Sequence, residues 1–155
     1  MSRLKEKDIP VQAGAARRHF SPAEATRALV LVRKIVADVV GQYGRMIDLQ
    51  EEMETAQGTG ANDRTESIQR ELVDAARRLQ GFATELDDVG VELKDWSLGV
   101  VDFPCLVDGR EAYLCWRHGE AAVEYWHEMC QDPSNRQPIG EIFSENVIGG
   151  TPVRA

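Results

Sequence analysis

The chain has 155 residues, the size of one ordinary domain, and its hydrophobic fraction of 43% and charged fraction of 28% are typical of a folded protein. Its formal net charge is -8 at pH 7, so we expect no nucleic-acid partner, because such partners need basic residues that neutralise phosphates. No apolar run approaches the roughly 20 residues of a membrane-spanning helix, and nothing near Met1 resembles a signal peptide.

The three cysteines, Cys105, Cys115 and Cys130, are an odd number in a chain that is long enough to fold without disulfides. Free, structural thiols in a reducing compartment are therefore expected, and we predict a cytoplasmic protein. We expect residues 1–18 to be a flexible arm, residues 19–143 to form a single domain and residues 144–155 to be a flexible tail.

The start of a first long helix is marked by Ser21, Pro22 and Glu24. Ser21 can cap the helix, Pro22 suits the first helical position, and Glu24 completes a capping box. The apolar residues that follow recur in steps of three and four, which predicts a heptad seam. The seam comprises Leu29, Val32, Val36, Val39, Tyr43, Met46 and Met53, with Gln50 in the one gap. A second stripe of Ala28, Leu31 and Ile35 widens the apolar face of the first turns.

A second helix follows after Gly58-Thr59-Gly60, with Asn62 or Asp63 as its expected cap. Its seam repeats the same spacing, at Ile68, Leu72, Ala75, Leu79, Phe82, Leu86 and Val89. Gly90 supplies a left-handed stop. Because the connection is short, the two helices must lie antiparallel, and we predict a helical hairpin over residues 21–90.

The period of the pattern changes to two after Gly90, and residues 91–94 are predicted to form a short strand. Asp108-Gly109 lies between two β-rich segments and is a strong signal for a two-residue hairpin turn. That turn would place Val101 opposite Trp116, Phe103 opposite Leu114 and Cys105 opposite Ala112. On the other face it would place Asp102 opposite Cys115 and Pro104 opposite Tyr113. Pro104 lacks an N–H, so the strand is expected to be an edge or bulged there.

A final short helix is predicted over residues 120–130, with Val123, Trp126, Met129 and Cys130 facing inward. The fold class is therefore α+β and mostly α. A long antiparallel helical hairpin precedes an α/β tip at residues 91–143, made of a small antiparallel β-hairpin or sheet and the short C-terminal helix.

The second half of the chain carries the motifs of a known family. They are Val91-Glu92-Leu93-Lys94-Asp95, Val101-Asp102-Phe103-Pro104, Asp108-Gly109-Arg110-Glu111, Leu114-Cys115-Trp116-Arg117, Gly119-Glu120, Trp126-His127-Glu128 and Arg136-Gln137-Pro138. Together with the capped start at residues 20–25, this pattern resembles the bacterial and archaeal family called domain of unknown function 2203, over roughly residues 19 to 139. The resemblance implies a small cytosolic protein in which a helical hairpin precedes a compact tip, and it implies no activity. His118 and Cys130 depart from the family's usual pattern.

Two arrangements could in principle hold a metal. Cys115 with His118 and His127 with Cys130 form closely spaced pairs of the kind that zinc uses. Glu124 with His127 has the spacing of a di-iron half-site, but such sites need two of these motifs on helices. A packed structural thiol is the ordinary alternative for each cysteine. We therefore predict no metal ligands and no cofactor.

A polar cluster at the tip is the third candidate, a ligand-binding site formed by Asp102, Cys115, Arg117, Glu120 and His127. A carboxylate beside an imidazole suits acid–base chemistry, and an arginine can bind an anion. The alternative is a purely structural network in which Asp102 pairs with Arg117, diagonally across the strands. No nucleophile elbow, phosphate loop, dinucleotide fingerprint or metalloprotease motif occurs.

Two functions remain open from the sequence. The first is an interaction or scaffold protein that assembles through its hairpin as a homodimer, since two helices alone cannot bury both apolar stripes. The alternative is a small-molecule (anion or metabolite) binding protein or a hydrolase that uses the tip cluster. The sequence does not decide whether the protein is an enzyme.

Overall fold

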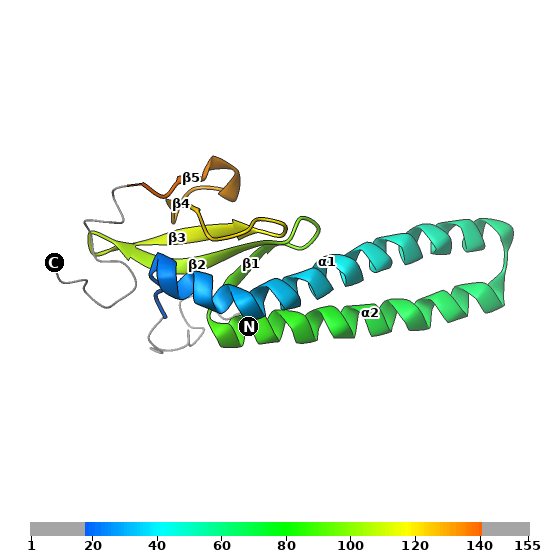
Figure 1. Ribbon diagram of the computed structural model, residues 1–155. Helices are drawn as coiled ribbons and strands as arrows, with labels where there is room; N and C mark the ends of the chain where they lie inside the picture. The colour runs from blue at the N-terminus through cyan, green and yellow to red at the C-terminus, as the bar shows by residue number, and fades with distance from the viewer. Residues whose placement is uncertain (1–17, 141–155) are drawn as a thin grey trace, which may run out of the picture.

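The computed structural model describes residues 18–140, which fold as a helical hairpin and one antiparallel sheet (Figure 1). The two helices lie side by side, and the sheet packs over only one end of the pair, so that the other end of the hairpin projects away from it. The predicted α+β class is confirmed. The predicted arm, apart from Arg18, and the predicted tail lie outside the described residues.

Helix α1 spans Pro22–Thr59 and begins as the sequence predicts. The Glu24 N–H donates to Ser21 Oγ over 3.0 Å, and the Ser21 N–H donates to Glu24 Oε1 over 2.8 Å. These reciprocal bonds satisfy two backbone donors that the first turn leaves without helical partners. The buried residues of the helix are Ala25, Leu29, Val32, Ile35, Val36, Val39, Leu49 and Ala56.

The buried stripe of α1 shifts to a different set of heptad positions in the distal half of the helix. Gln50, which the sequence places in the seam, is exposed, and Leu49 is buried instead. Leu49 and Ala56 continue the column of Ile35 at heptad spacing, because the distal half of α1 faces α2 alone and not the sheet. Leu31, expected in the second stripe, is 52% exposed.

Helix α2 spans Asn62–Val89 and runs back along α1. The predicted cap at Asn62 or Asp63 is wrong: both residues lie in the first helical turn, and the cap position is Ala61, whose side chain makes no capping bond. The left-handed Gly60 (φ 74°) turns the chain so tightly that the helix starts one residue earlier than the capping pattern suggests. Gly90 (φ 103°) ends α2 as predicted.

The sheet is a meander of five antiparallel strands in the order β1-β2-β3-β4-β5. The strands are β1 (Glu92–Asp95), β2 (Val100–Val107), β3 (Arg110–Arg117), β4 (Tyr125–Glu128) and β5 (Gln137–Pro138). Asp108 (φ 54°) and Gly109 (φ 82°) both adopt left-handed conformations in the β2–β3 turn. This turn sets the predicted register, and all five predicted pairs are found.

The predicted C-terminal helix over residues 120–130 is wrong, since this segment contains β4. Tyr125 and Trp126 favour strands, and β3 offers a free edge to pair with, so tertiary pairing overrides the weak helical spacing. Val123 and Trp126 are buried as expected, but Met129 and Cys130 are exposed. The only helical turn described after α2 is the 3₁₀ turn η3 (Pro133–Asn135).

Pro104 causes no bulge in the β2–β3 pairing, which is continuous past it. It lies beyond the last residue that pairs with β1, so β2 is locally an edge there, as the missing N–H requires. The Phe20 N–H donates to the Pro104 carbonyl over 2.7 Å and covers this edge. The one irregularity in the pairing of the described strands lies in β1, between Leu93 and Asp95.

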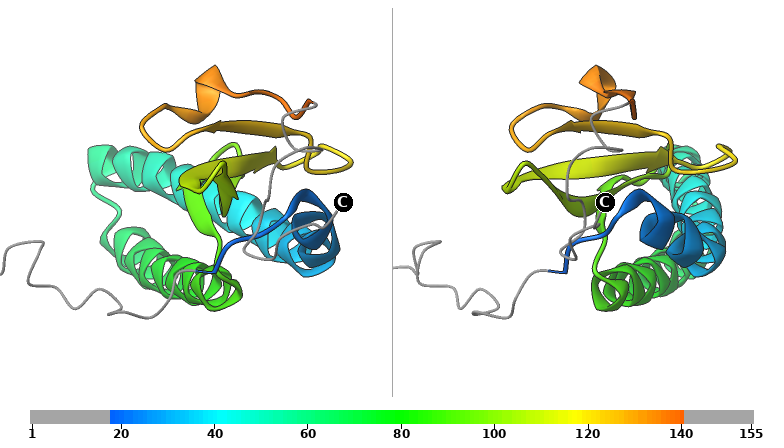
Figure 2. Two further views of the ribbon diagram at one scale, coloured as in Figure 1. Left: turned by 90° about the vertical axis from the view of Figure 1, so that its left-hand side faces the viewer. Right: turned by 60° about the vertical axis from the view of Figure 1, so that its left-hand side comes forward.

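The two faces of the sheet are covered by different parts of the chain (Figure 2). The apolar face, which carries Val101, Phe103, Leu114 and Trp116, packs against the hairpin and belongs to the main core. The opposite face carries Asp102, Tyr113, Cys115 and His127, and we call it the polar face. The segment that contains η3 and β5 folds over this side, away from the helices.

Gly99 joins the sheet to α1 at close quarters. A Cβ atom there would lie 2.8 Å from Val36 Cγ1 and 2.9 Å from Val40 Cγ2, and the φ of 75° also favours glycine.

Neither α1 nor α2 is long and apolar enough to serve as a membrane-spanning helix.

Candidate functional site on the polar face

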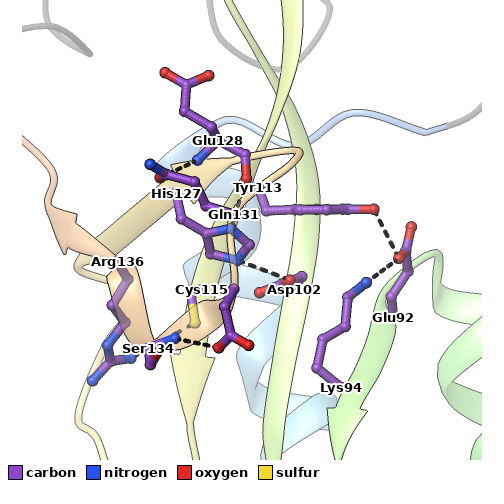
Figure 3. A network of polar contacts seen from close by, with 11 residues as sticks. Glu92, Lys94, Asp102, Tyr113, Cys115, His127, Glu128, Gln131, Ser134 and Arg136 are labelled. Carbon is purple, nitrogen blue, oxygen red and sulfur yellow. Dashed lines mark hydrogen bonds and ion pairs between the residues drawn. The ribbon is translucent and has the colours of Figure 1, made fainter.

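Three neighbouring strands bring three buried polar side chains together on the polar face. Asp102 from β2, Cys115 from β3 and His127 from β4 have relative exposures of 0%, 0% and 1%, and one ligand atom from each lies within 4.8 Å of the others. We call these three residues the tip cluster. His127 Nε2 lies 2.9 Å from Asp102 Oδ2, and Figure 3 shows the imidazole pointing at that carboxylate.

The two ring nitrogens of His127 have distinct partners. Nδ1 lies 2.9 Å from the Glu128 carbonyl oxygen, which can only accept, so Nδ1 carries a proton. Burial alone would lower the pKa of His127, but its interactions with Asp102 and Cys115 raise that pKa to about 10. At neutral pH the side chain is therefore an imidazolium paired with Asp102. The other carboxylate oxygen, Asp102 Oδ1, is buried without a hydrogen-bond partner.

A half-buried ion pair lies beside the tip cluster. Arg136 forms a bidentate pair with Glu120, with one contact of 3.1 Å between Nη1 and Oε1. Nη1 also lies 3.8 Å from Cys115 Sγ, and the guanidinium lies 4.1 Å from the centroid of the Tyr125 ring. Burial would raise the pKa of Glu120, but the hydrogen bonds from Arg136 and from the Arg117 N–H lower it.

A second polar network borders the cluster on the side of β1. Glu92 accepts from the Tyr113 hydroxyl over 2.9 Å and pairs with Lys94 Nζ over 3.0 Å. The Tyr113 ring in turn lies 5.4 Å from the His127 ring, between centroids, and 4.8 Å from Lys94 Nζ. Figure 3 shows Glu92 and Lys94 on the Asp102 side of the imidazole, with Tyr113 reaching toward Glu92, so the buried charges are part of a larger polar network.

A cavity of about 230 Å³ opens beside the cluster, between the polar face and the segment that covers it. Its lining residues are Lys94, Asp95, Leu98, Val100, Cys115, Arg117, Asp132, Pro133, Ser134 and Arg136. Cys115 is the one member of the tip cluster that reaches this cavity. The cavity therefore borders the cluster at Cys115, although Cys115 is itself buried.

The structure brings together most of the candidate site residues. Asp102, Cys115 and His127 meet directly, and Glu120 reaches Cys115 through Arg136. The predicted pairing of Asp102 with Arg117 is wrong, because Asp102 pairs with His127. Arg117 shares the face of Asp102 as the register requires, but its side chain stays exposed at the end of β3.

Sequence reasoning missed two cations of the site, Arg136 and Lys94. Arg136 lies after η3, in a segment without periodicity, and only its place in the motif Arg136-Gln137-Pro138 marks it. The alternating pattern of residues 91–94 predicts that Lys94 points outward from an ordinary strand. Neither contact follows from local spacing, because both depend on how β1 and the segment after β4 fold over the polar face.

The two metal arrangements considered from the sequence do not form. His118 stacks edge-on against Trp116, with ring centroids 6.3 Å apart, and Cys130 is exposed, so neither joins the tip cluster. Glu124 precedes a strand and not a helical turn, which removes the geometry of a Glu-x2-His half-site. Cys115 and His127 are the two ligand candidates that the fold keeps together.

The fold and the site define the class of this protein: an α+β protein in which a long helical hairpin carries a five-stranded meander with a buried polar cluster. The chain belongs to the family described as uncharacterized conserved protein, DUF2203, whose model matches residues 18–139. The match covers nearly all of the described residues and confirms the resemblance found from the motifs. No curated protein and no solved structure matches the chain.

Proposed function

We propose that the protein binds a small anion, or the anionic end of a metabolite, in the cavity of the polar face. The observation that carries the proposal is the arginine at its rim. Three cations line the cavity, of which Lys94 pairs with Glu92 and Arg136 pairs with Glu120. No ion pair found among residues 18–140 includes Arg117, whose guanidinium acts on Glu120 only through its charge at longer range.

The acidic residues of the cavity are already occupied by backbone donors. Asp95 Oδ1 accepts from the N–H groups of Ser97 and Leu98, and Asp132 Oδ1 accepts from the Ser134 N–H. These bonds hold both carboxylates in local turns, so the two carboxylates compete less with an incoming anion for Arg117. A planar guanidinium with open donors suits a carboxylate or a phosphate group.

The size of the cavity limits what enters it. Pockets for drug-sized ligands have volumes of roughly 300 to 1,000 Å³, and this one is smaller, at about 230 Å³. It fits a free phosphate-sized anion or one end of a longer molecule. We therefore expect recognition of a charged group rather than of an extended apolar body.

Binding is favoured over hydrolysis by the hydrogen bonds of His127. A cysteine hydrolase needs an imidazole nitrogen that is free to accept the thiol proton. Here Nδ1 is engaged by the Glu128 carbonyl and Nε2 by Asp102. His127 therefore has no nitrogen free to act as the base for Cys115, which favours a binding site.

Titration of the full chain with inorganic phosphate and with acetate, followed by amide NMR shifts, tests this proposal. We expect saturable shifts around the cavity in wild type and a loss of at least about tenfold in affinity in Arg117→Gln, because a charge-assisted pair is removed. Arg70→Gln, an exposed arginine on α2, is the matched control and should bind like wild type. Equal losses in both variants, or shifts that do not saturate, would contradict the proposal.

A second function, assembly through the hairpin, is supported by the distal half of α1 and α2. Leu49, Ala56 and Ile68 form a small core there, but Met53 and Leu72 beside it are only half-buried, and no third layer of the described residues covers them. Pairing two hairpins into a four-helix bundle would bury this stripe. We propose a homodimer on this basis.

Light scattering of the full chain tests the assembly. A dimer should give twice the chain mass of 17.3 kDa, and Leu72→Glu should return it to the single-chain mass because it places a charge in the proposed seam. Val73→Glu, whose side chain is 45% exposed, is the control. A wild-type mass near 17.3 kDa at micromolar concentration would reject the homodimer.

We also propose a cytoplasmic location, because Cys105, Cys115 and Cys130 are all free thiols.

A further inference from the structure

We propose that Asp102, Cys115 and His127 form a binding site for one divalent transition-metal ion of the zinc class. The three donors come from three adjacent strands, they are fully buried, and one ligand atom of each lies within 4.8 Å of the others. This ligand set differs from the Cys115, His118, His127 and Cys130 set that sequence spacing suggests. It also does not require that the neighbouring cavity binds an anion.

The donor chemistry selects the class of metal. A thiolate, an imidazole and a carboxylate together suit zinc or cobalt, whereas calcium and magnesium take oxygen donors alone. Two anionic ligands, Asp102 and Cys115, would balance the charge of a divalent ion. The nearby Arg136 adds no net charge, because Glu120 neutralises it. The buried site would therefore be close to neutral when it is loaded.

The hydrogen bond of Nδ1 orients the imidazole as metal sites require. Metal-binding histidines commonly donate their second ring N–H to a backbone carbonyl or carboxylate, which fixes the ring and directs the other nitrogen at the metal. Here Nδ1 faces the Glu128 carbonyl at 2.9 Å, and Nε2 faces the tip cluster. Arg136 Nη1 lies 3.8 Å from the sulfur, and its positive charge would stabilise a Cys115 thiolate.

An unpartnered oxygen is the second, independent observation. Asp102 Oδ1 is buried and accepts no hydrogen bond, which is costly for a carboxylate that serves only as an ion-pair partner. An oxygen that coordinates a metal has its lone pair satisfied. A cation bound at the tip cluster would compensate this acceptor.

Loading the site exchanges protons for the metal. The Nε2 proton of His127 and the thiol proton of Cys115 leave as the ion binds, so two protons are released for each divalent cation. Ligands at zinc lie roughly 3.3 to 3.8 Å from one another, given bond lengths of about 2.0 to 2.3 Å. Loading would therefore shorten separations of up to 4.8 Å by about 1 Å, and it would lengthen the 2.9 Å contact between His127 Nε2 and Asp102 Oδ2. Because Cys115 reaches the cavity, a water or an added donor could complete the coordination.

Cobalt(II) titration of the metal-free full chain tests the site, because a thiolate ligand gives cobalt an intense near-ultraviolet charge-transfer band. We expect one cobalt per chain, complete displacement by zinc, and the band in wild type. Cys115→Ser should lose the band, and Asp102→Asn and His127→Gln should bind at least about tenfold more weakly. Circular dichroism of each variant checks that it is folded.

Cys130→Ser and His118→Gln are the matched controls, since Cys130 is exposed and His118 lies outside the tip cluster. Both should bind cobalt as wild type does, and loss of the band in either would overturn the ligand set proposed here. Absence of a stoichiometric band in folded wild type would reject the metal site without any variant. Arg117→Gln should keep the metal while losing the anion, so the failures of the two proposals can be told apart.

Discussion

The two faces of the five-stranded sheet are both buried, but by opposite means. The apolar face contributes Phe103, Leu114 and Trp116 to a core shared with the hairpin, where burial itself stabilises the fold. The polar face buries Asp102 and His127, whose desolvation costs free energy that their pairing has to offset. Alternation along β2 and β3 places the two environments one residue apart.

This difference separates the face that stabilises the fold from the face whose buried charges folding alone does not explain. A hydrophobic pair of similar size would stabilise most sheets at least as well as a buried Asp–His pair. The charged residues also gather beside a cavity, next to the unpartnered Asp102 Oδ1. We infer that the hairpin face holds the sheet in place and that the polar face serves binding.

The largest effect is expected on the apolar side. Val36 is fully buried against the Gly99 turn, so Val36→Asp should lower the free energy of unfolding by several kcal/mol, because it buries an unpaired charge. Val30→Asp, at a position 68% exposed on the same helix, should cost about 0.5 kcal/mol or less. Urea unfolding of both variants measures the contrast. Similar losses in the two would mean that α1 does not face the sheet as described.

The next effect concerns the charged pair of the polar face. Asp102→Ala should destabilise the protein by about 3 to 5 kcal/mol, because it leaves His127 buried without its partner. The double replacement Asp102→Leu with His127→Phe should recover most of that loss, since neither charge remains. A double-mutant cycle built from Asp102→Leu, His127→Phe and the double variant, measured by denaturant unfolding, reports this coupling. Additive losses would show that the two side chains are energetically independent.

A smaller and pH-dependent effect is expected at Glu120. Its side chain is 21% exposed, and Glu120→Gln should cost about 1 kcal/mol or less at neutral pH. Because its folded pKa lies below the ordinary 4.5, the stabilisation is present above that pH and is lost as the pH falls through the folded pKa. Stability curves of wild type and variant should therefore converge in acid. A difference that persists there would contradict the ion-pair explanation.

The smallest effect on stability is expected at the exposed thiol. Cys130→Ser should leave the unfolding free energy unchanged, because Cys130 is exposed to solvent. In alkylation followed by mass spectrometry, Cys130 should react first. Burial raises the pKa of Cys105 to about 12, so this thiol should react only on unfolding. Fast labelling of Cys105 in the native protein would show that the apolar face is loosely packed.

Sequence reasoning predicts the features that local chemistry determines. The capping box of α1, the stops at Gly60 and Gly90, and the register set by Asp108-Gly109 all follow from residue types at fixed spacing. That register is enough to place Asp102 opposite Cys115. The fold class and the meeting of these two side chains on one face therefore follow from the amino-acid sequence alone.

Features that depend on distant partners do not follow from local spacing. Residues 125–128 form a strand because β3 offers an edge, and the strand preference of Tyr125 and Trp126 alone is too weak to predict this pairing. The sequence pattern pairs Asp102 with Arg117 because the two are diagonal in the β2–β3 register, and only the pairing of β4 with β3 brings His127 against Asp102. Arg136 enters the site only because the segment after β4 folds back over the polar face.

The protonation of His127 tests the central claim, that the polar face holds a preformed buried charge, most directly. In the metal-free protein, imidazole nitrogen NMR should find both nitrogens protonated throughout the neutral range, with loss of a proton only near pH 10. Since the folded pKa is raised, the pair stabilises the fold fully below the unfolded pKa of 6.5, and this contribution disappears as the pH rises through about 10. Titration of His127 near pH 6.5, with a free Nε2 at pH 8, would contradict the account.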